Sequence, residues 1–138
     1  NIVRADAAAV EKLSRFGVAT IHEAMGRVGL MKPNIRPIHP GAHICGTAVT
    51  VLLQPGDNWM LHVAAEQLQP GDVCVAACTA DSTDGFFGDL LATSYKSRGA
   101  KGLIIDGGVH AGDARFGQYS RGLCWRHRQS GRRGHCRR

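Results

Sequence analysis

The chain has 138 residues and a formal net charge of +6, and this length suits one domain with a modest hydrophobic core. It contains neither a run of twenty apolar residues nor a signal-peptide pattern, so we expect no transmembrane helix and no membrane partner. Five irregularly spaced cysteines exclude a disulfide framework and a regular zinc motif. We expect Cys45, Cys74 and Cys78 to be buried reduced thiols of a cytoplasmic protein.

The positive charge is concentrated at the C-terminal end of the sequence. Residues 1–109 hold nine Lys and Arg against ten Asp and Glu, a net charge of −1. Residues 110–138 hold eight Arg, no Lys and one Asp, a net charge of +7. The basic character therefore belongs to the C-terminal segment and says nothing about the main part of the chain.

Helical composition predicts a first helix over residues 5–16, ended by Gly17. Thr20 and Glu23, three residues apart, form a capping-box pattern for a second helix. His22 and Glu23 are candidate site residues, but capping and solvent exposure explain them more simply. Three prolines predict an extended loop over residues 30–43, in which His39 and His43 lack a third metal ligand nearby.

The middle of the chain alternates between strand and helix patterns. Apolar alternation predicts a strand over residues 45–53, and a short apolar run predicts a buried strand over residues 73–77. Between them lies a predicted helix over residues 59–67, capped by Asp57 or Asn58. Such alternation favours α/β layering.

Residues 84–111 predict a loop, a helix, a strand and a second loop. Asp84 is a candidate helix cap, and Gly99 suits the position just after the helix end. The residues that recur at helical spacing between them are Leu90, Leu91, Ser94 and Tyr95. The apolar run over residues 102–106 predicts a buried strand, which Gly107 ends.

This order of elements brings a helix N-terminus and a strand C-terminus to the same edge of a layered domain. Free N–H groups at a helix N-terminus bind anions, and ligands of open α/β sheets lie beyond the carboxyl ends of strands. Residues 88–91 and the loop 107–111 are therefore candidates to face one small anionic ligand. The simpler alternative, which the pattern alone favours, is an ordinary helix–strand unit with glycine-rich turns.

The same stretch resembles the signature of the 4-hydroxy-4-methyl-2-oxoglutarate aldolase family, the RraA-like family that also includes the regulator of RNase E activity A. The matching blocks are Gly88-Asp-Leu-Leu-Ala-Thr93 and Gly102-Leu-Ile-Ile-Asp-Gly-Gly-Val109, preceded by similar blocks at residues 17–24, 36–38 and 55–60. The resemblance implies an RraA-like aldolase domain over residues 1–109. It implies a swivelling β/β/α-type layered fold, normally assembled as a homotrimer or as a hexamer of two trimers.

The resemblance also implies the chemistry of a divalent-metal-dependent lyase. Such an enzyme cleaves 4-hydroxy-4-methyl-2-oxoglutarate-type 2-oxo acids to pyruvate and decarboxylates oxaloacetate as a side activity. Mg²⁺ or Mn²⁺ would act as a Lewis acid that stabilises the pyruvate enolate. The backbone of Gly88, Asp89, Leu90 and Leu91 would bind the substrate, and Asp89 would also act in catalysis by orienting a metal-bound water.

Where the family has an Arg-Asp pair after the strand, this chain has His110 and Ala111. His110 is the candidate for the substrate-binding and catalytic role of the arginine, although it lacks a bidentate guanidinium fork. Ala111 offers no side-chain ligand, so the metal ligands stay unassigned apart from Asp89 through water. Asn58 and His62 are candidate supporting groups, equally well explained as a cap and a surface histidine.

Residues 110–138 form a divergent Arg-rich tail in which the family pattern is nearly lost. One hypothesis is that this tail is translated from a shifted reading frame, so that the C-terminal part of the fold is incomplete. The competing hypothesis is an RNA-binding arm, in which Arg neutralises phosphate while Tyr119 and Trp125 stack on bases. In that case the chain is a non-catalytic regulator that binds a ribonuclease or RNA, and nucleic acid is otherwise not an expected partner. The irregular spacing of Cys124 and His127 argues against zinc.

Overall fold

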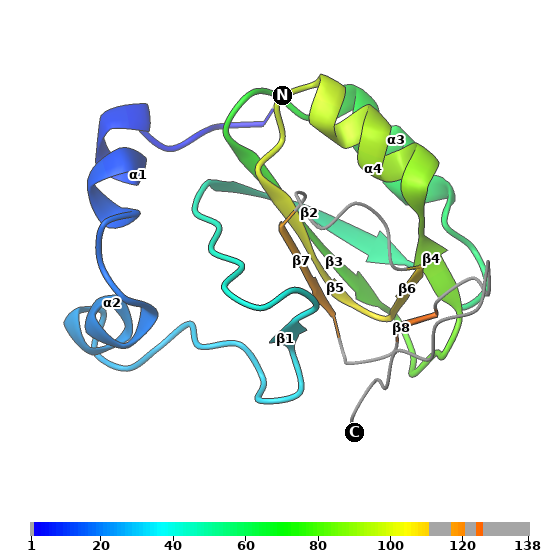
Figure 1. Cartoon of the computed structure of the whole chain (residues 1–138), viewed down its shortest axis with the longest axis horizontal. Coiled ribbons are helices and arrows are strands. Elements are labelled where there is room, and N and C mark those ends of the chain that lie inside the picture. The colour runs from blue at the N-terminus through cyan, green and yellow to red at the C-terminus, as the bar shows by residue number, and fades with distance from the viewer. Residues whose placement is uncertain (1, 111–116, 121–123, 126–138) are drawn as a thin grey trace.

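Figure 1 shows the computed structural model of the chain, which describes residues 2–110, 117–120 and 124–125. Within these residues the chain forms two β-sheets and four helices. The helices are α1 (Ala7–Leu13), α2 (Val18–Ala24), α3 (Trp59–Gln67) and α4 (Asp89–Ser97). The strands are β1 (Arg36–Pro37), β2 (Thr47–Leu53), β3 (Asp72–Cys78), β4 (Gly85–Phe87), β5 (Gly102–Asp106), β6 (Gly108–His110), β7 (Gly117–Ser120) and β8 (Cys124–Trp125).

The larger sheet has the strand order β1-β7-β5-β3-β2. Its four longer strands run parallel, and β1 pairs antiparallel with β7. The smaller sheet has the order β4-β6-β8 and is parallel throughout. Helices α3 and α4 lie side by side along one side of the sheets (Figure 1). Two sheets and a helical layer confirm the predicted α/β fold class.

The hydrophobic core lies between the larger sheet and the pair α3 and α4. On β2 the predicted alternation is confirmed, because Val49 and Leu53 are buried while Leu52 on the opposite face is exposed. From the helices, Leu61 and Tyr95 are fully buried. Other fully buried members of the core are Cys74, Phe87, Leu103, Ile105 and Val109.

A polar contact and a ring contact fix the two core helices to each other and to the smaller sheet. The Tyr95 hydroxyl donates a hydrogen bond of 2.9 Å to the Leu61 carbonyl oxygen, which joins α4 to α3. The Tyr95 ring meets the Phe87 ring edge-on, with 5.1 Å between the ring centroids. Burial raises the pKa of Tyr95, and it raises the pKa of the neighbouring Cys74 thiol to about 11. Both groups are therefore neutral at physiological pH.

The N-terminal segment is fastened to the larger sheet by an ion pair. The Arg4 guanidinium contacts the Asp72 carboxylate at 2.9 Å through Nη2 and at 3.1 Å through Nε. Asp72 is only 1% exposed, and it also accepts a 2.8 Å hydrogen bond from the Gln69 backbone N–H. The hydrogen bond to Asp72 raises the pKa of Arg4. Because the buried carboxylate is fully paired, the chain before α1 starts from a fixed point.

Several predicted elements match the structure closely. The helix predicted over residues 59–67 is α3, and the strand predicted over residues 102–106 is β5. Gly99 follows α4 with a φ of 79°, as expected for a glycine just after a helix end. Asn58 occupies the N-cap position of α3, and the carboxylate of Asp57 before it accepts a 2.7 Å hydrogen bond from the Trp59 backbone N–H.

Two predicted helix starts are wrong. The capping box fails because α2 begins at Val18 after an extended Gly17, which places Thr20 inside the helix. Asp84 does not cap α4, because β4 intervenes and Gly88 occupies the N-cap position. Phe86 and Phe87 are both buried, and pairing of their strand with β6 is stabilised by this burial.

The first helix is also shorter than predicted. It covers Ala7–Leu13, and the Asp6 carboxylate caps it by accepting a 2.8 Å hydrogen bond from the Ala9 backbone N–H.

In the described part of the chain, the helices are too short and too polar for any of them to span a bilayer.

Candidate functional site

The candidate site lies where β4 passes into α4. Gly88 is the N-cap in an extended conformation, and its carbonyl oxygen accepts a 2.9 Å hydrogen bond from the Ala92 backbone N–H. In such a helix start, the N–H groups of Asp89, Leu90 and Leu91 have no partner within the helix. They carry the positive end of the helix dipole, so they are suited to an anionic oxygen.

His110 comes to this place through the pairing of β6 with β4. The two strands are parallel, with Gly85 opposite Gly108 and Phe87 opposite Val109. A β-carbon built on Gly85 would lie 2.8 Å from His110 Nε2, so the imidazole ring lies directly against Gly85. A β-carbon on Gly88 would lie 4.0 Å from His110 Cβ and Cδ2. The exposed His110 side chain therefore lies beside the start of α4.

The predicted site residues at the helix start differ in which of their groups are accessible. The side chains of Asp89 and Leu90 are exposed, and Leu90 is 88% exposed. Leu91 is buried in the core, so only its backbone N–H is available to a ligand. Ala111, at the position of the family's metal-ligating Asp, lies outside the described residues.

Two residues, Asn58 and Asp84, hold the site in shape through contacts that the sequence did not predict. The Asn58 side-chain amide donates a 3.0 Å hydrogen bond to the Phe86 carbonyl oxygen, which ties the start of α3 to β4. The Asp84 carbonyl oxygen accepts a 3.1 Å hydrogen bond from the Gly108 backbone N–H, which aligns β4 with β6. Asn58 was a candidate supporting group, but the sequence did not predict this contact. Asp84 was expected only as a helix cap.

The other candidate side chains lie elsewhere. His62 is exposed, and its ring packs against Trp59 with 6.4 Å between the centroids. His43 Nε2 lies 3.0 Å from the Ser14 carbonyl oxygen. Nε2 of His39 is buried without a hydrogen-bond partner. None of these imidazoles is placed at the α4 start by a described contact.

The described donor groups are too scattered to ligate a metal ion directly. Among the described residues, no three His, Cys, Asp or Glu side chains come together in a way that could hold a metal ion. At the helix start the donors are the exposed Asp89 carboxylate and the His110 imidazole. Cys45, Cys74 and Cys78 are free thiols, of which only Cys74 is fully buried.

Several known proteins of similar sequence or structure carry aldolase or RraA names. A provisionally named 4-hydroxy-4-methyl-2-oxoglutarate aldolase of Halalkalibacterium halodurans is 29% identical over 89 residues, covering 64% of this chain and 42% of that protein. RraAS2 of Streptomyces coelicolor, described as an unusual member of the RNase ES inhibitor RraA protein family, superposes with a TM-score of 0.72 at 24% identity. That superposition covers 90% of this chain and 67% of RraAS2.

A protein of Pseudomonas syringae pv. tomato also superposes with a TM-score of 0.72, at 23% identity, over 89% of this chain and 60% of that protein. The match to the Halalkalibacterium halodurans protein spans less than half of that protein's length. The sequence model described as RraA-like, Aldolase/RraA matches residues 18–135, a range that continues past Val109. The expected domain division at residue 109 stays a prediction. The match over most of its length shows that the chain belongs to the RraA-like (Aldolase/RraA) family.

Proposed function

We propose that the chain is a lyase of this family that binds a small 2-oxo acid at the start of α4 and releases pyruvate from it. The substrate class is the 4-hydroxy-4-methyl-2-oxoglutarate type, with oxaloacetate decarboxylation as a side activity. The observation that carries the proposal is the position of the His110 ring, against Gly85 and beside the N-cap of α4. The provisional name of the Halalkalibacterium halodurans relative supports it.

In this proposal the backbone binds the substrate carboxylate and the His110 ring contacts the keto oxygen. The N–H groups of Asp89, Leu90 and Leu91 donate to the carboxylate of the 2-oxo acid, by the helix-terminus chemistry described above. The His110 ring donates an N–H hydrogen bond to the keto oxygen, where negative charge develops as the C–C bond breaks. The exposed Asp89 carboxylate accepts a hydrogen bond from a water and so orients it. This water takes the 4-hydroxyl proton as the C–C bond breaks, and a proton returned from it to the enolate carbon gives pyruvate.

The family resemblance adds a divalent cation, Mg²⁺ or Mn²⁺, which would supply Lewis-acid chemistry. The described donors do not fit a directly ligated ion, because no cluster of three ligands occurs among the described residues. The cation stays part of the proposal, and the chelator in the assay below tests it.

The experiment is pyruvate release from oxaloacetate by the purified chain, with Mg²⁺, with Mn²⁺ and with EDTA, each against a protein-free blank. We expect cation-dependent turnover, and at least a tenfold lower kcat/KM for His110→Ala, because an oriented hydrogen-bond donor at the reacting oxygen contributes about that much or more. His62→Ala is the matched control, since His62 is exposed and packs on Trp59.

The double substitution His110→Arg and Ala111→Asp restores the family pair and should raise the rate. Wild-type turnover that His110→Ala leaves unchanged would contradict the assigned role of His110. A complete lack of turnover in the wild-type chain and in the double variant would contradict the lyase proposal.

A second candidate function is supported by the tail. Residues 110–138 hold eight Arg, and the Streptomyces coelicolor neighbour is described within an RNase inhibitor family. In this alternative the chain is a non-catalytic regulator that binds a ribonuclease or RNA. RNA affinity that falls steeply between about 50 and 200 mM salt, together with no pyruvate release, would favour it.

Assembly and location complete the proposal. We propose a homotrimer or hexamer, as the resemblance implies, to be measured by light scattering. A cytoplasmic location agrees with three free thiols in the described part of the chain.

A further inference from the structure

Helices α3 and α4 begin at the same edge of the larger sheet, which is the edge of the candidate site. Helix α3 follows β2 and α4 leads into β5, and these two strands run parallel with β3 between them. Both helices therefore start beyond the carboxyl ends of the strands, and they lie side by side (Figure 1). The hydrogen bond from Asn58 to the Phe86 carbonyl oxygen holds the α3 start against β4, which leads directly into α4.

The first turns of both helices present large apolar side chains to solvent. Leu90 is 88% exposed in the first turn of α4, and Trp59 is 66% exposed as the first residue of α3. Met60, next to Trp59, is also exposed. Side chains on a helix tilt toward its N-terminus, so Leu90 leans over the helix start at which its own N–H has no partner within the helix. Apolar surface therefore lies next to the place where the substrate carboxylate binds in the proposed function.

The charge around this place is negative. Residues 37–95 carry six Asp and Glu and no Lys or Arg. The exposed Asp89 lies in the first turn of α4, and the exposed Asp84 directly precedes the glycine against which the His110 ring lies. Lys96 belongs to the last turn of α4, at the opposite end of the helix. A second carboxylate on a ligand bound here would meet like charges, which disfavour its binding.

We infer that the site prefers 2-oxo acids with one carboxylate and an apolar far end over dicarboxylates of similar length. The single carboxylate binds the N–H groups of the α4 start, and the apolar end packs on Leu90 and on the α3 start. This inference rests on the proposed function and concerns which of its 2-oxo acids binds best. The preferred substrate is then a 4-hydroxy-2-oxo acid with an apolar group on C4.

Cleavage of such an acid balances without a further reactant. The bond between C3 and C4 breaks, and C4 with its oxygen becomes the carbonyl group of an uncharged aldehyde or ketone. The 4-hydroxyl group loses one proton, and C3 takes up one proton to form pyruvate.

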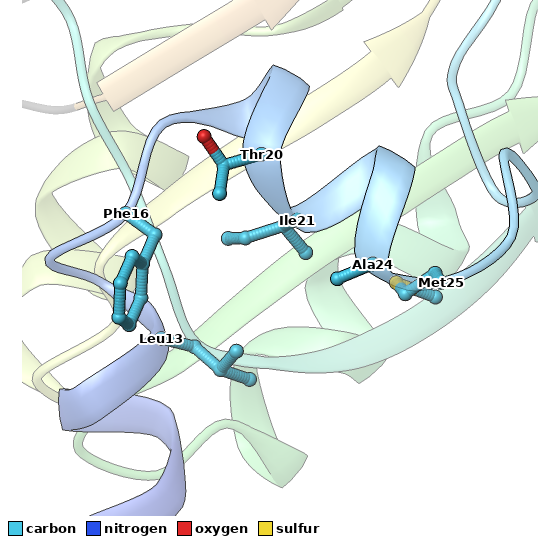
Figure 2. Close-up of a pocket in the computed structure, with 6 residues that line it drawn as sticks. All are labelled: Leu13, Phe16, Thr20, Ile21, Ala24 and Met25. Carbon is cyan, nitrogen blue, oxygen red and sulfur yellow. The ribbon is translucent and has the colours of Figure 1, made fainter.

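The chain has a second apolar surface, a hollow between α1 and α2 with a volume of about 330 Å³. Figure 2 shows the residues that line it, which are Leu13, Phe16, Thr20, Ile21, Ala24 and Met25. None of these side chains carries a charge, so the hollow offers no partner to the carboxylate that all 2-oxo acids share. It lies on the opposite side of the molecule from the β4 and α4 junction (Figure 1), so binding at the two places can be distinguished.

The test is a ¹H–¹⁵N NMR titration of the full chain with 4-methyl-2-oxopentanoate and, separately, with 2-oxoglutarate. The two acids share the 2-oxo acid group, and both lack the 4-hydroxyl that cleavage needs, so binding is measured without turnover. We expect both to shift the backbone resonances of residues 89–91. The Kd of 4-methyl-2-oxopentanoate should be at least tenfold lower, because burial of its branched apolar end contributes about that much.

Leu90→Lys tests the residue assigned to this preference. It removes the apolar contact and places a cation beside the same N–H groups, so it should reverse the order of the two affinities. Val3→Lys is the control, because Val3 is 92% exposed and precedes Arg4, which pairs with Asp72 at the amino end of β3. A purely structural effect would change both affinities together and leave their ratio as it was.

Each remaining outcome overturns a defined part of the account. Equal affinities, or tighter binding of 2-oxoglutarate, would overturn this inference alone and leave pyruvate release from oxaloacetate to decide the proposed function. The inference also fails if Leu90→Lys leaves the ratio unchanged, or if 4-methyl-2-oxopentanoate shifts only residues 7–31. If neither acid shifts residues 89–91, there is no anion site at the α4 start, and the proposed function fails together with the inference.

Discussion

Gly85→Ala tests whether the position of His110 matters for the proposed chemistry. The added β-carbon would lie 2.8 Å from His110 Nε2, whereas ordinary contacts begin at 3.4 Å, so the ring must move by about 0.6 Å or more. Gly85 is not in the left-handed region of φ, so alanine introduces no backbone strain there. The obstructed atom is the far end of an exposed side chain, so the free energy of unfolding should change by only about 0.5 kcal/mol.

Activity should respond much more strongly than stability. A displacement approaching 1 Å of a catalytic group can cost about a hundredfold in rate, so we expect kcat/KM for oxaloacetate to fall about tenfold or more. The assay is steady-state pyruvate release, paired with thermal unfolding of the same preparation. Gly17→Ala is the matched control, since its β-carbon would meet nothing within 4 Å. A folded Gly85→Ala chain with wild-type kcat/KM would refute the placement of His110 at the reacting groups.

Three further predictions test the fold. Leu53→Ala should lower the free energy of unfolding by about 2–5 kcal/mol in urea denaturation, because Leu53 is fully buried. Leu52→Ala, on the exposed face of β2, should change it by less than about 0.5 kcal/mol. Equal effects of the two substitutions would contradict the β2 alternation. Tyr95→Phe removes the hydrogen bond to the Leu61 carbonyl oxygen and should cost about 0.5–1.5 kcal/mol by the same measurement, and no loss would show that this bond contributes nothing. Burial raises the pKa of Cys74 to about 11, so its reactive thiolate forms mainly above that pH. Alkylation at pH 8, followed by mass spectrometry, should therefore leave Cys74 unmodified until the chain unfolds. Rapid labelling of Cys74 in the folded chain would contradict this prediction.

The elements that the sequence predicted well are those whose signal is local. The helix over residues 59–67 has a cap and an apolar periodicity of its own, and β5 is a continuous apolar run. In contrast, β4 has three residues and β1 has two, and each depends on pairing with a strand distant in sequence. No local pattern reveals such pairing. Without β4, Asp84 would stand close to the start of α4, and the sequence therefore predicts a helix cap there.

The candidate site shows the same division. The helix start at residues 88–91 was predicted from glycine, acidic and apolar residues at local spacing. That His110 lies against Gly85 could not be predicted, because it depends on the register of β6 with β4. Helical periodicity grouped Leu90 with Leu91, but packing against the core buries Leu91 and leaves Leu90 exposed. The Asn58 contact with Phe86 likewise joins segments whose spacing in the sequence carries no signal.

Binding of a small anion at the start of α4 is measured most directly by a ¹H–¹⁵N NMR titration of the chain with oxalate, a dianion similar in shape and charge to the pyruvate enolate. We expect saturable shifts centred on the backbone N–H groups of Asp89, Leu90 and Leu91 and on the His110 ring, and their loss in His110→Ala. Saturating oxalate that leaves these resonances unchanged, or that shifts only residues 7–31, would contradict anion binding at this helix start.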